Sequence, residues 1–408
     1  MRPPLVLTEY IPSDPVALSV AERDALRGLV PGLTIEPIPG STDTYTLTGG
    51  SSVGVVRVGE LTVELRPKIG IAPVLFLLSY ALDAKAWREP PAELVRDANL
   101  AEAIVPLFVR AAQAALRPGL LHGYRPQDDT LVTVRGRVRM AEQMRARTGL
   151  PMPVEVRYDE FTPDILENRL LRTAVDVLGR LRLRHRAPRI ALARLRQQFN
   201  GIGGLVVDRR DVPEPTWTRL NERYRPAVAL ARLILSGAGL EGRAGGQDAS
   251  ALVVDMNTVF ERFIRVALRE ALQLDAKAFP AAGCGHRIHL DVGRSIPLEP
   301  DLSWWIAGRC VFAGDCKYKR TTGTVPNADV YQMLAYLTAL RLPEGLLIYA
   351  AGENAPPDLR IEHVDKRIHV RIIDVAQPPA VVIANVRTLS ALVHGMAHSR
   401  PSSVSPGA

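Results

Sequence analysis

Two stretches of the chain repeat apolar and polar residues at a regular spacing. Residues 53–65 alternate between apolar and polar positions on both sides of Gly59-Glu60, a pattern typical of a β-hairpin with a tight turn. Residues 256–268 place apolar side chains at helical spacing after Asp255, a residue type that favours helix starts. Strands and amphipathic helices therefore occur in one chain, and we predict a mixed α/β (α+β) fold.

The pattern before residue 246 predicts further elements. Helical spacing predicts helices over residues 15–29, 73–84, 100–116, 220–235 and one that starts at Thr162-Pro163-Asp164. Residues 131–140 alternate with arginines on one face, which predicts a strand. Residues 180–186 fit a strand by their alternation and a helix by their setting, so both remain open. The glycine-rich segment 237–246 predicts a linker.

The order of predicted elements after residue 246 is helix, strand, strand, helix and then further strands. The first two strands form a hairpin between Glu299 and Lys319, and Asn327 can cap the second helix. Further strands are expected at residues 345–350 and 368–374.

These elements predict four regions along the chain. They are an N-terminal mixed α/β domain (1–125), an arginine-rich and largely helical middle region with its linker (126–245), a domain with a central mixed sheet flanked by helices (246–396), and a disordered tail (397–408).

Positive charge is concentrated in the middle of the chain. The whole sequence has a net charge of +8, whereas residues 130–225 alone hold 20 Arg, no Lys and 11 acidic residues. Such a segment can follow the phosphates of DNA. It can equally form a solvated helical surface or bind an acidic protein, and charge alone does not choose between these roles.

The three cysteines and the apolar runs limit the class of protein. Cys284, Cys310 and Cys316 are an odd number without paired spacing, which argues against a disulfide framework and favours a reducing cytoplasm. Cys284 lies near two histidines, but a zinc site usually has four ligands in paired spacing, so we interpret this cluster as structural or incidental. The amino terminus lacks a signal peptide, and the apolar run 74–82 is too short to cross a bilayer, so no membrane partner is expected.

The predicted hairpin after residue 299 carries the strongest candidate chemistry. Asp301 and Asp315 bracket it, and because side chains on a strand alternate, Asp315 and Lys317 share one face while Cys316 points to the other. Two carboxylates suit Mg²⁺ or Mn²⁺, and a lysine beside them outlines a site for phosphodiester hydrolysis. The alternative is a turn aspartate near an exposed salt bridge along one strand face. Lysine is scarce, with six in the chain, and two of these lie in this motif.

Pro300-Asp301 followed by Asp315-Cys316-Lys317 resembles the PD-(D/E)xK nuclease signature, and the element order matches the order of that core. The resemblance implies a restriction-endonuclease-like domain in the C-terminal region and assigns roles to further residues. Glu261 would be a third carboxylate, and the carbonyl of Cys316 would help Asp301, Asp315 and Glu261 to hold the metal. The remaining two residues, Gln332 and Tyr336, are similar to the Gln-x-x-x-Tyr element of RecB-like nucleases and would position the DNA backbone or the lysine.

Blocks elsewhere in the chain resemble the McrC family, the nuclease subunits of modification-dependent restriction systems. They are Glu64–Gly70, Asp159–Asp164, Asn168–Leu171, Asn221–Tyr224 and the helix that starts with Met256-Asn257. The resemblance implies that the amino-terminal half docks onto a hexameric AAA+ GTPase of the McrB type and stimulates it, and that the pair cleaves DNA. The partner would recognise the methylated base.

The chain has no phosphate-cradling P-loop, so we expect it to bind no nucleotide itself. Two other functions remain open at this point. One is a regulator that activates a ring NTPase through a nuclease fold without activity, which the complete acid-acid-lysine set disfavours. The other is a standalone RecB-like nuclease, which would not need the large amino-terminal half.

Overall fold

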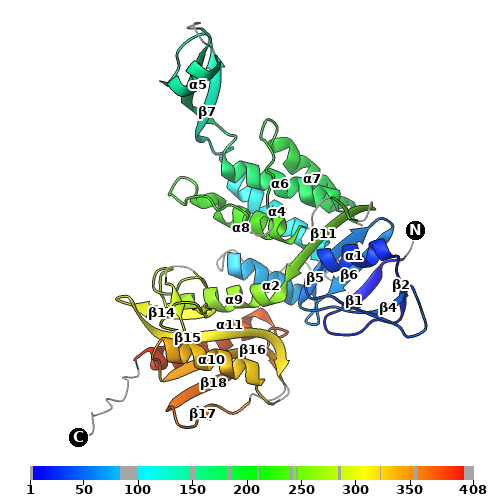
Figure 1. Ribbon diagram of the computed structural model, residues 1–408, viewed down its shortest axis with the longest axis vertical. Helices are drawn as coiled ribbons and strands as arrows, with labels where there is room; N and C mark the ends of the chain where they lie inside the picture. The colour runs from blue at the N-terminus through cyan, green and yellow to red at the C-terminus, as the bar shows by residue number, and fades with distance from the viewer. Residues whose placement is uncertain are drawn as a thin grey trace. The chain divides into compact units, whose positions relative to one another are not determined.

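The computed structural model describes residues 3–82, 100–146, 152–181, 183, 185–208, 211–238, 242–244, 247–283, 286–321, 323–352 and 356–398. The chain divides into two compact units, one of Met1–Ala103 with Leu240–Ala408 and one of Ile104–Gly239 (Figure 1). Sheets and helices occur together, as the predicted mixed α/β class requires. The boundaries differ from those predicted near 125 and 245, because both ends of the chain contribute to the first unit.

A five-stranded sheet in the first unit joins the start of the chain to residues 242–255. Its order is β1 (Leu5–Thr8), β6 (Leu61–Arg66), β5 (Ser52–Val58), β11 (Gln247–Asp255) and β10 (Gly242–Ala244). The hairpin predicted over residues 53–65 is confirmed as β5 and β6, with Gly59 in the left-handed conformation that its turn requires (φ 57°). The linker predicted over 237–246 is wrong in its described part, because β10 belongs to this sheet.

A smaller sheet and two helices complete the amino-terminal part. The sheet has the order β2 (Val16–Ala17), β4 (Thr44–Thr48) and β3 (Thr34–Pro37). The helix predicted over residues 15–29 starts later, as α1 (Val20–Leu29), because Ser19 and Glu22 form a capping box at its start. The apolar helix predicted over 73–84 is α2 (Ile71–Leu82), which buries Val74 to Leu78.

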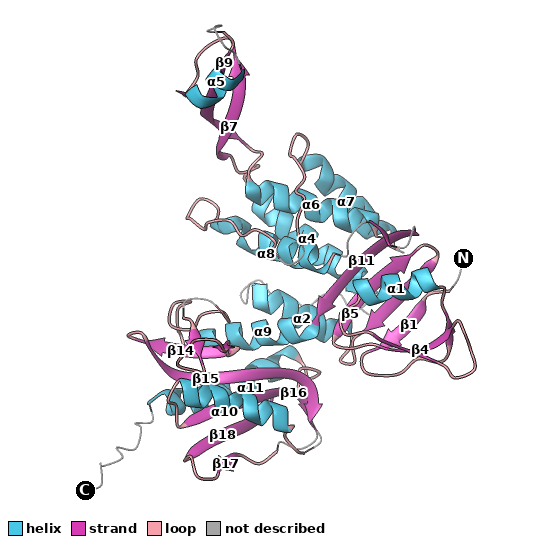
Figure 2. Cartoon of the chain, viewed as in Figure 1, coloured by secondary structure: helices cyan, strands magenta, loops and turns pink. Residues whose placement is uncertain are grey.

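The second large sheet of the first unit is mixed. Its order is β14 (Leu302–Ile306), β15 (Arg309–Thr321), β16 (Glu344–Gly352), β18 (Lys366–Ile372) and β17 (Leu359–Ile361) (Figure 2). The two strands β14 and β15 form the predicted hairpin, with a turn through Ala307 and Gly308. Strands β15, β16 and β18 run parallel, and the strands predicted at 345–350 and 368–374 are confirmed. A separate two-stranded hairpin, β12 (Ile288–His289) with β13 (Pro297–Leu298), leads into β14.

Helices cover both faces of this sheet. On one face, α10 (Asn327–Ala339) packs Met333 and Leu337 against Leu347 of β16 and Val370 of β18. On the other face lie α9 (Met256–Ala271) and α11 (Pro379–His398), which both contact β15. The predicted apolar side of α9 is confirmed, because all seven residues of that side are buried. The result is a helix–sheet–helix arrangement with β15 at its centre.

The second unit combines helices with a small sheet. Its helices are most of α4 (Leu100–Leu116), α6 (Leu166–Arg180), α7 (Arg186–Gln198), η1 (Glu222–Tyr224) and α8 (Arg225–Gly237). The sheet has the order β7 (Gly123–Leu131), β9 (Val154–Thr162) and β8 (Arg137–Val138), with α5 (Met140–Ala146) beside it. Several arginines pair within this unit, so part of the positive charge is offset locally; the pairs include Arg172–Asp176, Arg196–Asp176 and Arg157–Asp128.

Two predictions for this unit are wrong. Residues 131–140 form no continuous strand, because Gly136 has a left-handed φ of 71° and packs too closely on Arg157 and Tyr158 for a side chain. The helix predicted to start at Thr162 begins at Leu166, and the Thr162 hydroxyl accepts a hydrogen bond from the Asp164 backbone instead. The segment 180–186 falls partly outside the described residues.

The asparagines of two sequence blocks hold loop ends in this unit. Asn168 donates to the carbonyls of Leu121 and Pro163, at 2.8 and 2.7 Å. Asn221 donates to Glu167 at 2.8 Å and to the carbonyl of Thr216 at 2.9 Å. Because both side chains are almost fully buried, these bonds satisfy groups that water cannot reach. We interpret the two blocks as structural.

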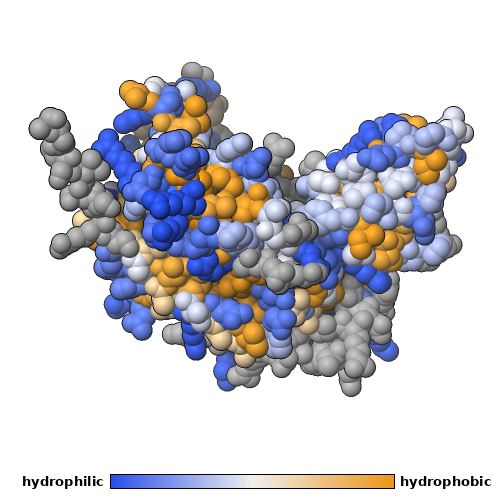
Figure 3. Space-filling view, turned by 90° about the horizontal axis from the view of Figure 1, so that it is seen from below, coloured by the Kyte–Doolittle hydropathy of each residue, from blue (hydrophilic) through white to orange (hydrophobic). Residues whose placement is uncertain are grey.

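Helix α11 has the length and apolar composition of a membrane-spanning segment. Within the fold it packs on α9 and β15 through Val382, Val386, Leu389 and Val393, so its apolar face serves the core of the unit. On the face drawn in Figure 3, hydrophobic and hydrophilic side chains are interspersed. Residues 397 and 398, predicted to begin the disordered tail, form the last residues of α11, and residues 399–408 lie outside the described residues.

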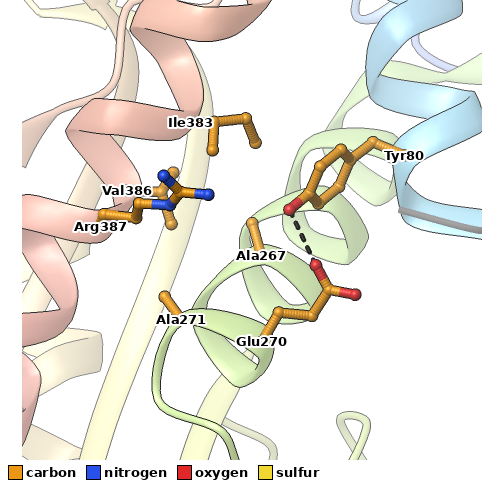
Figure 4. Close-up of a pocket in the computed structure, with 7 residues that line it drawn as sticks. All are labelled: Tyr80, Ala267, Glu270, Ala271, Ile383, Val386 and Arg387. Carbon is orange, nitrogen blue, oxygen red and sulfur yellow. Dashed lines mark hydrogen bonds between the residues drawn. The ribbon is translucent and has the colours of Figure 1, made fainter. Parts of the chain in front are cut away.

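A cavity of about 220 Å³ lies where α2, α9 and α11 meet (Figure 4). Tyr80 of α2 donates a hydrogen bond to Glu270 of α9 at 2.9 Å. Arg387 reaches toward the same space from α11. The remaining lining is mostly small and apolar.

Candidate active site

The hairpin of β14 and β15 brings the two predicted aspartates together. Leu302 pairs with Gly314, so Asp301 just before β14 lies beside Asp315 and Cys316 on β15. The backbone N–H of Cys316 donates to Asp301 Oδ2 at 2.7 Å. Asp315 is 1% exposed. The alternative of a turn aspartate near an exposed salt bridge does not fit this burial.

Lys317 joins the two carboxylates from the same face of β15. Its Nζ lies 2.5 Å from Asp315 Oδ2 and donates a hydrogen bond to Gln332 Oε1 at 2.8 Å. Burial opposes the charge of the ammonium, but the negative charges of Asp315 and Asp301 outweigh it and raise the pKa of Lys317. Lys317 is therefore a cation at neutral pH.

Helix α10 holds the lysine through a chain of hydrogen bonds. Gln332 Nε2 donates to the Tyr336 hydroxyl at 2.9 Å, and this hydroxyl donates to the carbonyl of Glu299 at 3.1 Å. Gln332 and Tyr336 share one face of the helix because they are four residues apart. The structure thus places Gln332 in contact with Lys317 and Tyr336 in contact with Gln332. Asn327 is the first helical residue, so the cap predicted for it lies instead at Pro326, without a side-chain hydrogen bond.

The two aspartates lie in an environment that disfavours two negative charges. Burial, followed by the charges of Asp315 and Glu261, raises the pKa of Asp301 to about 7. Burial also raises the pKa of Asp315, although Lys317 counteracts part of this effect. Perturbed carboxyl groups of this kind are concentrated at functional sites.

Glu261 and Cys316, the other two residues expected to hold a metal, lie near the two aspartates. Glu261 is close enough for its charge to raise the pKa of Asp301, but its carboxylate pairs with Arg265 at 2.5 Å. Among the described residues, no three His, Cys, Asp or Glu side chains are grouped closely enough to hold a metal ion. The Cys316 thiol is buried, and desolvation raises its pKa, so its side chain is no ligand candidate. Cys284 of the other cysteine–histidine cluster lies outside the described residues.

The donor set nevertheless suits a divalent cation. Asp315 Oδ2 is buried and, among the described residues, accepts no hydrogen bond of good geometry, although Lys317 lies 2.5 Å away. A second cation between Asp301 and Asp315 would offset their repulsion and supply the missing partner. Carboxylate oxygens are the ligands that Mg²⁺ and Mn²⁺ prefer.

A second buried carboxylate near the site was missed by the sequence analysis. Asp329, in the first turn of α10, accepts a hydrogen bond from the Tyr349 hydroxyl at 2.6 Å and pairs with Lys319 at 2.7 Å. Its charge contributes to the raised pKa of Asp315. One signal was present, because Lys319 follows Lys317 on the same strand face. The carboxylate partner could not be identified without the packing of α10 on β15 and β16.

Fold and site together define an α+β protein with a buried carboxylate–lysine site on a helix-covered mixed sheet. The family model described as "McrBC 5-methylcytosine restriction system component" matches residues 47–350. The chain therefore belongs to this McrBC family, which confirms the resemblance found in the sequence.

Two solved structures are similar to this chain, and the first of them shows a likeness of fold. One is a half-complex from a tetradecameric assembly of Thermococcus gammatolerans McrB AAA+ hexamers with bound McrC, with 18% identity and a TM-score of 0.52 over 95% of this chain and 100% of that chain. Another is the Thermococcus gammatolerans McrBC complex, with 22% identity and a TM-score of 0.40 over 66% of this chain and 88% of that chain. No curated protein matches the sequence.

Proposed function

We propose that this chain is the nuclease subunit of a modification-dependent restriction system and that it hydrolyses phosphodiester bonds of DNA with Mg²⁺ or Mn²⁺. The observation that carries the proposal is the buried group of Asp301, Asp315 and Lys317. The helix–sheet–helix arrangement around β15 is the layout expected of a PD-(D/E)xK domain. Membership of the McrBC family supports the restriction role.

Each residue of the site has a separate role in the proposed hydrolysis. Asp301 and Asp315 would hold the metal, which when bound lowers the pKa of a water and offsets charge on the phosphate. Lys317 is positively charged, so it donates hydrogen bonds to the attacking water or the phosphate and does not act as a general base. Gln332 fixes the lysine, and Tyr336 ties Gln332 to the carbonyl two residues before Asp301.

A AAA+ GTPase hexamer of the McrB type is the partner that we propose. Support comes from the family and from the fold likeness to McrC bound to McrB hexamers. The second unit also offers a surface for docking, at the end of the β7–β9 sheet and along α5. Apolar side chains lie exposed there, which is typical of protein interaction surfaces; they are Val132 (72%), Val134 (61%), Met140 (57%) and Met144 (67%).

Reconstitution with the GTPase tests this function. The purified chain is incubated with Mg²⁺ and either methylated or unmethylated plasmid, alone and with the candidate partner and GTP. Cleavage that needs partner, GTP and methylation is expected. Cleavage by the chain alone would indicate a standalone nuclease. Faster GTP hydrolysis without any DNA cleavage would indicate a regulator on a nuclease fold.

A further inference from the structure

The back of the catalytic strand carries a buried polar contact that the proposed reaction does not use. Tyr318 follows Lys317 directly, so its side chain points to the opposite face of β15. It is 1% exposed, and its hydroxyl donates a hydrogen bond to Glu9 Oε2 at 3.2 Å. Glu9 follows β1, so this bond joins the amino-terminal sheet to the catalytic strand.

Lys68, two residues after the end of β6 in the same amino-terminal sheet, completes the contact. Its backbone N–H donates to Glu9 Oε2 at 2.9 Å, and its Nζ lies 4.6 Å from the centre of the Tyr318 ring. A second ring, that of Tyr10, lies 5.2 Å from the same ammonium. A cation over aromatic faces at these distances is attracted to them. Lys68 belongs to the sequence block Glu64–Gly70, and neither the fold nor the proposed reaction explains its role.

Burial makes this contact costly to break. Glu9 is 3% exposed, and its Oε1 accepts no hydrogen bond from the part of the chain that the structure describes. A buried carboxylate depends on the few partners that it has, here the Lys68 backbone, the nearby Lys68 charge and the Tyr318 hydroxyl. Removing any of these partners leaves the Glu9 carboxylate buried with fewer groups to offset its desolvation, which costs free energy. These contacts therefore fix the position of the Tyr318 side chain and, through it, the position of β15.

The same sheet also fixes the other side of the site. Strand β11 of the amino-terminal sheet ends at Asp255, which caps α9 by accepting a hydrogen bond from the Asn257 backbone. Ser51 donates to Asp255 at 2.8 Å, and Met256 donates through its backbone to the carbonyl of Ser51 at 2.9 Å. Helix α9 contacts β15 and carries Glu261. One sheet thus anchors both the helix and the strand of the site.

We propose that Glu9, Lys68 and Tyr318 are positioning residues through which the amino-terminal sheet holds β15 in the geometry needed for catalysis. The inference rests on the proposed nuclease function for its effect on rate. It does not rest on that function for its structural effect, because the contact is independent of any reaction. The amino-terminal sheet then supports the active site by fixing the position of β15, in addition to any role in docking.

Two measurements on Lys68→Met in the full chain test the proposal. Methionine keeps the length of the side chain and removes the charge over the Tyr318 ring. Arg66→Met is the matched control, because Arg66 is two residues away and 58% exposed and pairs with Glu64 instead. Hydrogen exchange of peptides from 309–321 should become several-fold faster in Lys68→Met only, while exchange in β16 and β18 stays unchanged.

The second measurement is cleavage kinetics in the assembly with the GTPase. Lys68→Met and Tyr318→Phe should lower kcat about tenfold and leave KM for DNA within about twofold, because they shift catalytic groups and touch no DNA. Lys68→Arg should restore much of the rate, since a guanidinium also binds aromatic faces.

The two proposals fail in different ways. Unchanged exchange in β15 for both Lys68→Met and Tyr318→Phe would overturn the positioning role, whether or not the protein cuts DNA. A loss that appears in KM alone, or equally in Arg66→Met, would overturn it as well. Absence of cleavage by the wild-type assembly would overturn the nuclease function, and the exchange result would still decide the structural role.

Discussion

Replacing Asp301 with asparagine should stabilise the protein at the same time as it destroys the site. The folded chain raises the pKa of Asp301 from 3.8 to about 7. Since one pKa unit corresponds to about 1.4 kcal/mol, the carboxylate is disfavoured by on the order of 4 kcal/mol at pH 8. Part of this destabilisation comes from repulsion by Asp315, and the two carboxyl groups share it. We therefore expect Asp301→Asn to raise the free energy of unfolding by roughly 2–4 kcal/mol. Asparagine keeps an oxygen that can accept the Cys316 N–H.

The pH dependence has a definite sign. Because the folded pKa lies above the unfolded value, the folded state retains a proton that the unfolded state has lost between pH 4 and 7. The free energy of unfolding of the wild type therefore falls as pH rises through this window, and the destabilisation by Asp301 reaches its full value above pH 7. The advantage of Asp301→Asn should be greatest at pH 8 and about two fifths as large at pH 5.

Thermal unfolding at pH 5 and pH 8 without divalent cations measures the effect. At roughly 2 °C per kcal/mol for a unit of this size, Asp301→Asn should raise Tm by about 4–8 °C at pH 8. Mg²⁺ should narrow this difference, because it stabilises only the wild-type carboxylate pair. Asp365→Asn is the control, since that side chain is 84% exposed. A gain no larger than that of the control, or one that is equal at both pH values, would refute the reasoning.

Three further outcomes follow from the contacts around the site. Gln332→Ala should lower kcat by about tenfold, because Lys317 loses the acceptor that orients it, and an unchanged single-turnover rate would contradict this role. Tyr349→Phe should cost about 1–3 kcal/mol, because buried Asp329 loses a donor; thermal unfolding checks this, and an unchanged Tm would contradict it. Met144→Glu should reduce stimulation of the partner's GTP hydrolysis at limiting concentrations and leave Tm unchanged, whereas full stimulation would place the docking surface elsewhere.

Local patterns were sufficient to predict the elements that carry the site. The hairpin of β14 and β15 and the apolar face of α9 follow from period two and period 3.6 in the sequence. Alternation along β15 correctly placed Asp315 and Lys317 on one face and Cys316 on the other. These features depend only on residues close together in the sequence, so the sequence pattern is sufficient to predict them.

Features that depend on distant pairing were not predictable in the same way. Strand β11 belongs to the amino-terminal sheet because it pairs with β5, almost 200 residues earlier, and nothing local in 247–255 indicates that partner. Strand β7 is polar on both faces and lacks the alternation that reveals a half-buried strand. The contact of Tyr318 with Glu9 is decided by tertiary packing.

Single-turnover cleavage of DNA by the assembled protein with Mg²⁺, compared between the wild type and Lys317→Ala, tests the central claim most directly. DNA binding and Tm are recorded for both proteins in the same buffer. The account predicts that Lys317→Ala folds, binds DNA and the GTPase, and forms no cleavage product. Cleavage by Lys317→Ala at the wild-type rate would contradict the assignment of Asp301, Asp315 and Lys317 as the hydrolytic site.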